Sequence, residues 1–180
     1  MPMPIVVDAS VAIALIRREP VAPSARRTIA QHGAAGQRLL VPDVFWIELV
    51  NVLARRYSAT SEEIVGALRD IDDLAIESIR LDRALLLAAI DMQQRHRLPA
   101  YDAVYLALVE AEDGQLITLD ARLADAAGGR AIRIDGMPPR HLAEETATYG
   151  GEPIDWARFG PYLARLRAEA REGVRAVARD

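Results

Sequence analysis

Short apolar runs that alternate with helix-forming segments constrain the fold of this chain more than any other feature of its sequence. The runs are rich in β-branched residues and do not alternate with polar ones, which is typical of strands covered on both faces. The expected strands cover residues 4–8, 38–41, 75–79, 115–119 and 131–134. The expected helices cover residues 10–17, 21–32, 43–57, 61–72, 82–97, 100–111 and 121–126, with Ser10 and Asp43 expected as the N-caps of the first and third. Since helical crossovers join parallel strands, we expect an α/β fold with a mostly parallel central sheet of about five strands, flanked by helices.

The character of the chain changes after Asp135. Residues 136–155 are rich in Gly, Pro and polar groups, and residues 155–179 have helical periodicity with one apolar face. That face carries Trp156, Phe159, Leu163, Leu166, Ala170, Val174 and Val177. We therefore expect a first domain over residues 1–135, followed by a linker and a C-terminal helical appendage over residues 136–180. Two roles remain open for the helix: packing back on its own domain, or binding a partner or second subunit.

Four acidic residues lie beside the expected core. Asp8 and Asp120 each end an apolar strand, Glu48 interrupts an apolar helix, and Asp102 opens another. In open parallel sheets, ligands bind outside the carboxyl ends of the strands, where the strand order reverses. If the first and fourth strands are neighbours, Asp8 and Asp120 lie close enough to share a cation. Because a carboxylate near a core is costly unless it is paired or bound to a cation, the set predicts one divalent metal site.

Each acid also has an ordinary structural explanation. Asp102 could be the N-cap of its helix, and Asp8 could be a turn residue at the end of its strand. Glu48 shares a stripe at i, i+4 spacing with Val44 and Val52, which we expect to face the core, so it could instead pair with an arginine. The joint pattern favours the metal site over these separate explanations.

The residue types indicate which metal and which chemistry to expect. The chain has no cysteine, and His32, His96 and His141 do not have the spacing of metal ligands. Carboxylates alone select Mg²⁺ or Mn²⁺ over zinc, and such ions commonly bridge to phosphates and activate water. The expected reaction is therefore phosphodiester hydrolysis.

Other acid-rich α/β proteins fit the sequence less well. A response-regulator receiver relies on a lysine, and this chain has none. A haloacid-dehalogenase-like phosphatase needs Asp-x-Asp after the first strand, where this chain has Asp8-Ala9-Ser10. The glycine-rich motifs of P-loop and dinucleotide-binding proteins do not occur in the sequence.

The acids stand in four recognisable segments. These are Ile5-Val6-Val7-Asp8-Ala9-Ser10-Val11, residues 41–53 around Glu48, Leu98-Pro99-Ala100-Tyr101-Asp102-Ala103-Val104-Tyr105-Leu106-Ala107-Leu108, and Leu116-Ile117-Thr118-Leu119-Asp120-Ala121-Arg122-Leu123. Together they resemble the PIN-domain family and, within it, the VapC-type toxins of toxin–antitoxin pairs. The resemblance spans about residues 4–134, and the third segment is its most specific part.

This resemblance implies a PIN-like three-layer sandwich and a Mg²⁺- or Mn²⁺-dependent endoribonuclease that cleaves RNA with metal-activated water. It also implies restraint by a cognate antitoxin protein, and a homodimer. By residue match, the expected catalytic metal ligands are Asp8, Glu48, Asp102 and Asp120, with Ser10 and Thr118 as supporting hydrogen-bonding residues. The alternative is a non-catalytic metal-binding regulatory or assembly module on the same fold, acting through its C-terminal helix. The complete set of acids favours the nuclease.

Charge and hydropathy limit the remaining function classes. The net charge is −4, which argues against a protein that simply coats nucleic acid. All 22 residues counted as lysine or arginine are arginines, and several of them are adjacent in the sequence. The lack of cysteine fits a reducing cytoplasm, and no apolar stretch reaches the roughly 20 residues that span a bilayer. We therefore expect a cytoplasmic protein without a membrane segment.

Overall fold

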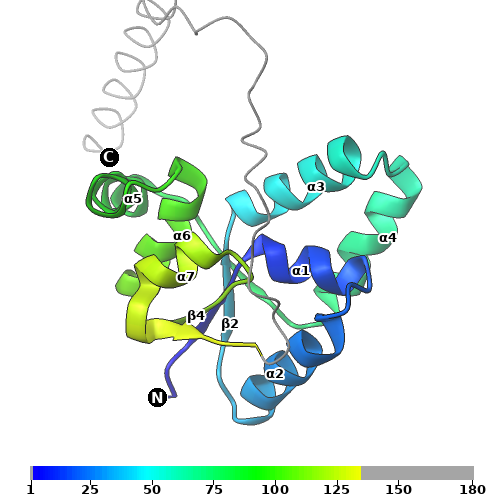
Figure 1. Ribbon diagram of the computed structural model, residues 1–180, viewed down its shortest axis with the longest axis horizontal. Helices are drawn as coiled ribbons and strands as arrows, with labels where there is room; N and C mark the ends of the chain where they lie inside the picture. The colour runs from blue at the N-terminus through cyan, green and yellow to red at the C-terminus, as the bar shows by residue number, and fades with distance from the viewer. Residues whose placement is uncertain (1, 135–180) are drawn as a thin grey trace, which may run out of the picture. The chain divides into compact units, whose positions relative to one another are not determined.

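Five parallel strands form the centre of residues 2–134, the part of the chain that the computed structural model describes (Figure 1). The strands are β1 (Ile5–Val7), β2 (Leu39–Pro42), β3 (Glu77–Ile79), β4 (Gln115–Ile117) and β5 (Ala131–Ile132). Their order in the sheet is β3-β2-β1-β4-β5, and each neighbouring pair is parallel. The chain extends the sheet from β1 first toward β3 and then, through β4, toward β5. The strand order therefore reverses between β1 and β4.

Helices connect the strands and cover both faces of the sheet. They are α1 (Ala9–Ile16), α2 (Ala22–Ala34), α3 (Val44–Arg56), α4 (Ser61–Asp72), α5 (Arg83–His96), α6 (Ala100–Ala111) and α7 (Ala121–Ala127), followed by the short 3-10 helix η1 (Gly128–Arg130). Figure 1 shows α1, α2 and α4 on one side of the sheet and α6 and α7 on the other. No helix within residues 2–134 is long and apolar enough to cross a membrane.

The centre of the fold is the contact between α6 and the middle of the sheet. Every residue of β1 is buried, and so is each residue of α6 from Ala103 to Val109. Helix α6 contacts β1, β2 and β4 as well as α5 and α7, which explains why residues 103–109 are apolar on all sides. Its residues are consequently held rigidly against the strands whose ends carry acids.

The predicted α/β fold with a mostly parallel sheet between helices is confirmed, and the expected elements are present with ends shifted by a few residues. One expected helix cap is wrong: α1 begins after Asp8, so Ser10 lies inside the helix. Asp43 does precede α3, but its carboxylate accepts a hydrogen bond from the Leu81 N–H at 3.4 Å and does not cap the helix. The predicted C-terminal appendage, residues 136–180, lies outside the described residues.

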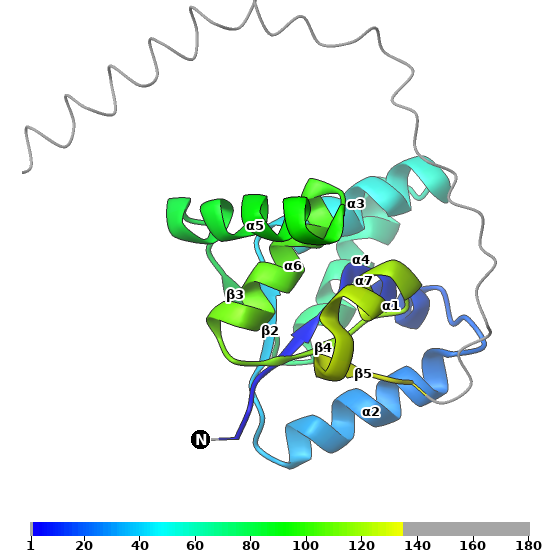
Figure 2. The same ribbon diagram turned by 60° about the vertical axis from the view of Figure 1, so that its left-hand side comes forward.

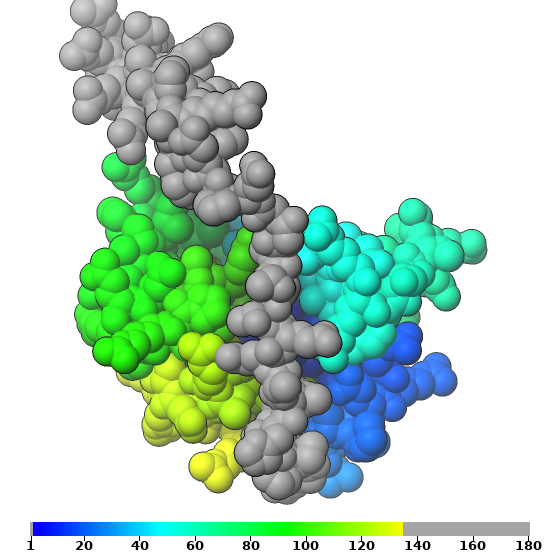
Figure 3. Space-filling view, turned by 45° about the horizontal axis from the view of Figure 1, so that its top comes forward, coloured from blue at the N-terminus to red at the C-terminus, as the bar shows by residue number. Residues whose placement is uncertain are grey.

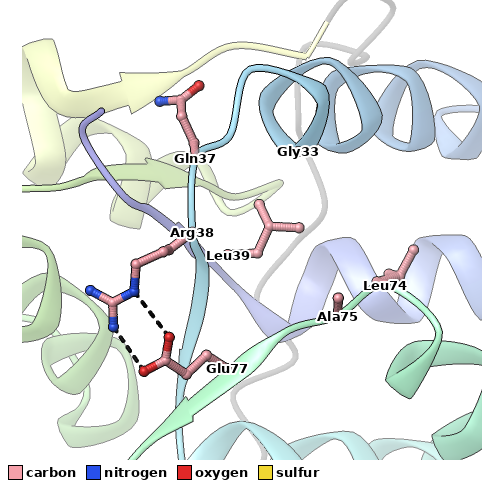
Figure 4. Close-up of a pocket in the computed structure, with 7 residues that line it drawn as sticks. All are labelled: Gly33, Gln37, Arg38, Leu39, Leu74, Ala75 and Glu77. Atoms are coloured by element: carbon pink, nitrogen blue, oxygen red, sulfur yellow. Dashed lines mark hydrogen bonds and ion pairs between the residues drawn. The ribbon is translucent and has the colours of Figure 1, made fainter. Parts of the chain in front are cut away.

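An open cavity of about 210 Å³ lies at the amino-terminal ends of β2 and β3 (Figure 4). It is lined by Gly33, Gln37, Arg38, Leu39, Leu74, Ala75 and Glu77. The Arg38 guanidinium donates two hydrogen bonds to Glu77, at 3.0 and 2.8 Å, and lies 3.4 Å from a Glu112 oxygen. The pairing of Arg38 with Glu77 links the start of β2 to β3, and the cavity lies at the opposite ends of the strands from Asp8 and Asp120.

Candidate active site

The four acids selected from the sequence come from four elements that meet near the carboxyl ends of β1 and β4. Asp8 follows β1, Asp120 follows β4, Glu48 lies in the second turn of α3, and Asp102 lies in the first turn of α6. The pairing of β1 with β4 continues one residue beyond β1, because the Asp8 N–H donates to the Ile117 carbonyl at 3.0 Å. Figure 2 shows β1 leading into α1 and β4 leading toward α7 at the same end of the sheet. Asp8 is buried, and the other three acids are half-buried.

Two hydroxyl groups hold the Asp8 carboxylate. The hydroxyls of Ser10 and Thr118 both donate to Asp8 Oδ2, the latter at 2.7 Å. Each hydroxyl oxygen also accepts a backbone N–H: Ser10 from Leu119 at 3.0 Å, and Thr118 from Asp120 at 2.9 Å. Because the amides occupy the acceptor side of each oxygen, the hydroxyl protons are directed at the carboxylate. The network joins the segment after β1 to the segment after β4.

The acids that follow a strand or open a helix have different local roles. Asp120 is the N-cap of α7, and its Oδ1 accepts the Leu123 N–H at 2.9 Å. Its other oxygen makes no hydrogen bond with residues 2–134. Asp102 is the third residue of α6, whose N-cap is Pro99, so the alternative that Asp102 is the N-cap is wrong.

Glu48 is held by a residue that sequence reasoning missed. The Tyr105 hydroxyl donates to Glu48 Oε2 at 2.9 Å. Tyr105 is fully buried in α6, one turn after Asp102, so α6 supplies one acid and holds another. The i, i+3 spacing from Asp102 was the available signal, because such residues share a helix face. Within the described residues no arginine pairs with Glu48, which removes the ion-pair alternative for that part of the chain.

The helix phase of α3 also differs from the prediction. The stripe Val44, Glu48 and Val52 is half-buried, whereas the stripe that faces the core is one residue further along and comprises Phe45, Leu49 and Leu53. Glu48 thus lies at the edge of the core, where its carboxylate is partly shielded from water but can still reach the other acids.

Burial and mutual repulsion make the site strongly acidic. Burial, followed by repulsion from Asp8, Asp102 and Asp120, raises the pKa of Glu48 from 4.5 to about 7, against the opposing hydrogen bond from Tyr105. Burial is likewise the main reason why the pKa of Asp8 is raised; repulsion by Asp120 adds to it, and the two hydroxyl groups oppose it. The pKa of Tyr105 is raised by burial and by the charges of Asp8 and Glu48, so its phenol stays protonated as a donor. The carboxylates are therefore close enough to repel one another, and a cation would relieve that repulsion.

The donor set has the chemistry of a site for a hard divalent cation, since it offers carboxylate oxygens and no histidine or cysteine. The four acids do not form a closed cage around an ion: across residues 2–134, no three His, Cys, Asp or Glu side chains form a group able to hold one. Mg²⁺ usually keeps several waters and is bound through only one or two carboxylates. The arrangement therefore fits a hydrated ion, with the remaining acids contacting its water molecules.

The comparison with known proteins decides the family. The model of the PIN domain family matches residues 5–129, a segment that contains all four acids. The chain belongs to the PIN-domain family. It is also 32% identical over 127 residues to Ribonuclease VapC3 of Pyrobaculum aerophilum, in an alignment that covers 68% of this chain and 94% of that protein.

Solved structures of VapC-type proteins share the PIN-domain fold of this chain. VapBC2 from Rickettsia felis, bound to a DNA fragment from its promoter, superposes with a TM-score of 0.61 at 14% identity, covering 74% of this chain and 100% of that one. VapC20 from Mycobacterium tuberculosis, described as a sarcin–ricin loop cleaving toxin, superposes with a TM-score of 0.55 at 20% identity. The match covers 68% of this chain and 94% of that one. A toxin–antitoxin complex from Klebsiella pneumoniae superposes with a TM-score of 0.52 at 20% identity, covering 71% of this chain and 95% of that one. At these identities the similarity concerns the fold, and with the relative above it confirms the resemblance to VapC-type PIN domains.

Proposed function

We propose that this protein is a divalent-metal-dependent endoribonuclease and the toxin of a VapBC-type toxin–antitoxin pair. The observation that carries the proposal is the meeting of Asp8, Glu48, Asp102 and Asp120 where the strand order of a PIN domain reverses. The relative named Ribonuclease VapC3 supports RNA as the substrate. VapC20, whose described target is the sarcin–ricin loop, has the same fold.

The proposed cofactor is Mg²⁺ or Mn²⁺, bound by these four acids directly or through water. When bound, the ion supplies activation of a water molecule and stabilisation of charge at the scissile phosphate. Ser10 and Thr118 orient the buried carboxylate of Asp8, and the backbone N–H of Leu123 orients that of Asp120. Glu48, with a pKa of about 7, is half protonated near neutral pH in the metal-free protein and becomes ionised when a cation binds.

The proposed inhibitor is an antitoxin encoded with the toxin. Two of the solved structures with this fold are described as VapBC2 or as a toxin–antitoxin complex. An acidic site of this kind would accept an arginine from the antitoxin, because a guanidinium matches carboxylates through paired hydrogen bonds.

We further propose that two copies of the chain form a homodimer. Apolar side chains are exposed on α5 and α3, which both reach the face shown in Figure 3. They include Leu86, Leu87 and Ile90 on α5 and Ile47 on α3, the last with 70% of its surface exposed. Association would bury such side chains and stabilise the assembly.

The proposed activity is tested with the purified full chain, freed of any antitoxin, on single-stranded RNA. We expect internal cleavage with Mn²⁺, none with a chelator, and none by Asp102→Asn. Asp125→Asn, which changes an exposed acid on α7, is the matched control and should cleave like the wild type. Cleavage that survives chelation, or survives Asp102→Asn with an unchanged circular dichroism spectrum, would refute the proposal. A wild-type protein that binds Mn²⁺ but cuts no RNA would favour the non-catalytic metal-binding module.

A further inference from the structure

We propose that Tyr105 is a positioning residue that holds the Glu48 carboxylate in the geometry required by the cation. This inference rests on the proposed metal-dependent function. It assigns to α6 a second task beyond carrying Asp102: keeping an acid of another helix within the site.

Glu48 needs an external anchor. Its side chain is long, lies at the edge of the core, and makes no ion pair within residues 2–134. Three other carboxylates repel it, so an unanchored Glu48 would turn toward water and away from them. The hydrogen bond from Tyr105, at 2.9 Å, is the one that holds it in the described part of the chain. That bond engages Oε2 and leaves Oε1 available to an ion or its water.

Tyr105 is suited to this task because its own position is fixed. It is 0% exposed and belongs to a helix packed on β1, β2 and β4. Like Ser10 and Thr118, Tyr105 presents a hydroxyl to a carboxylate of the site.

A purely structural role would make a different prediction. A buried phenol must find some hydrogen-bond acceptor, and Glu48 could simply be the nearest one. In that case loss of the hydroxyl would change stability but leave the affinity for the cation unaltered. A positioning role instead links the hydroxyl to metal affinity through Glu48, because residues that orient a metal ligand typically contribute 10–100-fold to affinity.

The test is Mn²⁺ binding to the full chain, measured by titration calorimetry in the absence of RNA. Tyr105→Phe removes one oxygen and keeps the buried ring, and we expect it to weaken Mn²⁺ binding by about 10-fold or more while the circular dichroism spectrum is unchanged. Tyr57→Phe removes a hydroxyl from the C-cap of α3, outside the acidic site, and should bind Mn²⁺ like the wild type. In a Glu48→Gln background, Tyr105→Phe should have almost no further effect, because its influence acts through Glu48.

Each outcome has a distinct meaning. Equal Mn²⁺ affinity of the wild type and Tyr105→Phe would overturn the positioning role and leave the metal site standing. Full and independent effects of Glu48→Gln and Tyr105→Phe in the double variant would overturn it too, since Tyr105 would then act by another route. A wild-type protein that does not bind Mn²⁺ would refute the proposed function itself, and the positioning role with it.

Discussion

Glu48→Gln should stabilise the metal-free protein at alkaline pH. The substitution removes the negative charge but keeps the size of the side chain and an acceptor for the Tyr105 hydroxyl. In the wild type, burial and the neighbouring carboxylates raise the pKa of Glu48 from 4.5 to about 7, so the folded protein binds this proton more tightly than the unfolded chain does. The contribution of Glu48 to stability is consequently greatest below pH 4.5 and is lost as the pH rises through 7. A glutamine carries no such penalty.

The size of the effect follows from the pKa difference. A rise from 4.5 to about 7 corresponds to about 3 kcal/mol at roughly 1.4 kcal/mol per pKa unit. This is an upper figure, because water reaches the half-buried Glu48 and screens part of the repulsion. We therefore expect Glu48→Gln to gain about 1–3 kcal/mol at pH 8, which is roughly 3–10 °C in melting temperature for a domain of this size.

The assay is thermal and urea unfolding in the presence of a chelator at pH 5 and pH 8. The advantage of Glu48→Gln should be small at pH 5 and fully developed at pH 8. Glu110→Gln, which neutralises an exposed glutamate on α6, serves as the matched control and should gain no comparable advantage. A Glu48→Gln protein that is less stable than the wild type at pH 8, or whose advantage does not change with pH, would refute the electrostatic reasoning.

Two further predictions concern the supporting network and the domain boundary. Thr118→Val removes a hydroxyl that donates to Asp8 and accepts the Asp120 N–H, so urea unfolding should show a loss of about 1–3 kcal/mol in the free energy of unfolding. Thr118→Ser keeps the hydroxyl and should lose much less stability. Equal losses in the two variants would contradict the role of the hydroxyl. We also propose that residues 1–135 are the complete nuclease domain, so truncation after Asp135 should preserve the circular dichroism signature of the fold and Mn²⁺-dependent RNA cleavage. A folded truncation without cleavage would show that residues 136–180 contribute to the site.

The fold was predictable because its central strands, β1, β2 and β4, are largely buried and therefore read as uninterrupted apolar runs. The run at Ile5–Val7 and that at Gln115–Ile117 become adjacent parallel strands, and the acids Asp8 and Asp120 that follow them meet for that reason. The sequence made this meeting conditional on β1 and β4 being neighbours; the structure supplies that adjacency, since the carboxyl ends of neighbouring parallel strands lie at the same edge of the sheet.

Side-chain partners were less predictable, because they depend on helix phase and on long-range packing. The one-residue difference between the expected and observed core stripes of α3 rotates the helix by about 100° and decides how deeply Glu48 is buried. The bond from Tyr105 to Glu48 joins residues 57 apart in sequence, on helices whose relative placement only the packed core determines. Ser10, expected as a helix cap, instead donates to Asp8, a choice that depends on the nearby segment after β4.

The most direct test of the central claim, that these carboxylates form a divalent-metal site, is an anomalous difference map from crystals of the full chain grown with Mn²⁺. We expect a peak beside the carboxylates of Asp8, Glu48, Asp102 and Asp120, in direct contact with one or two of them, and loss of that peak in Asp8→Asn crystals. Ordered side chains at full Mn²⁺ saturation with no peak among these four acids would contradict the account.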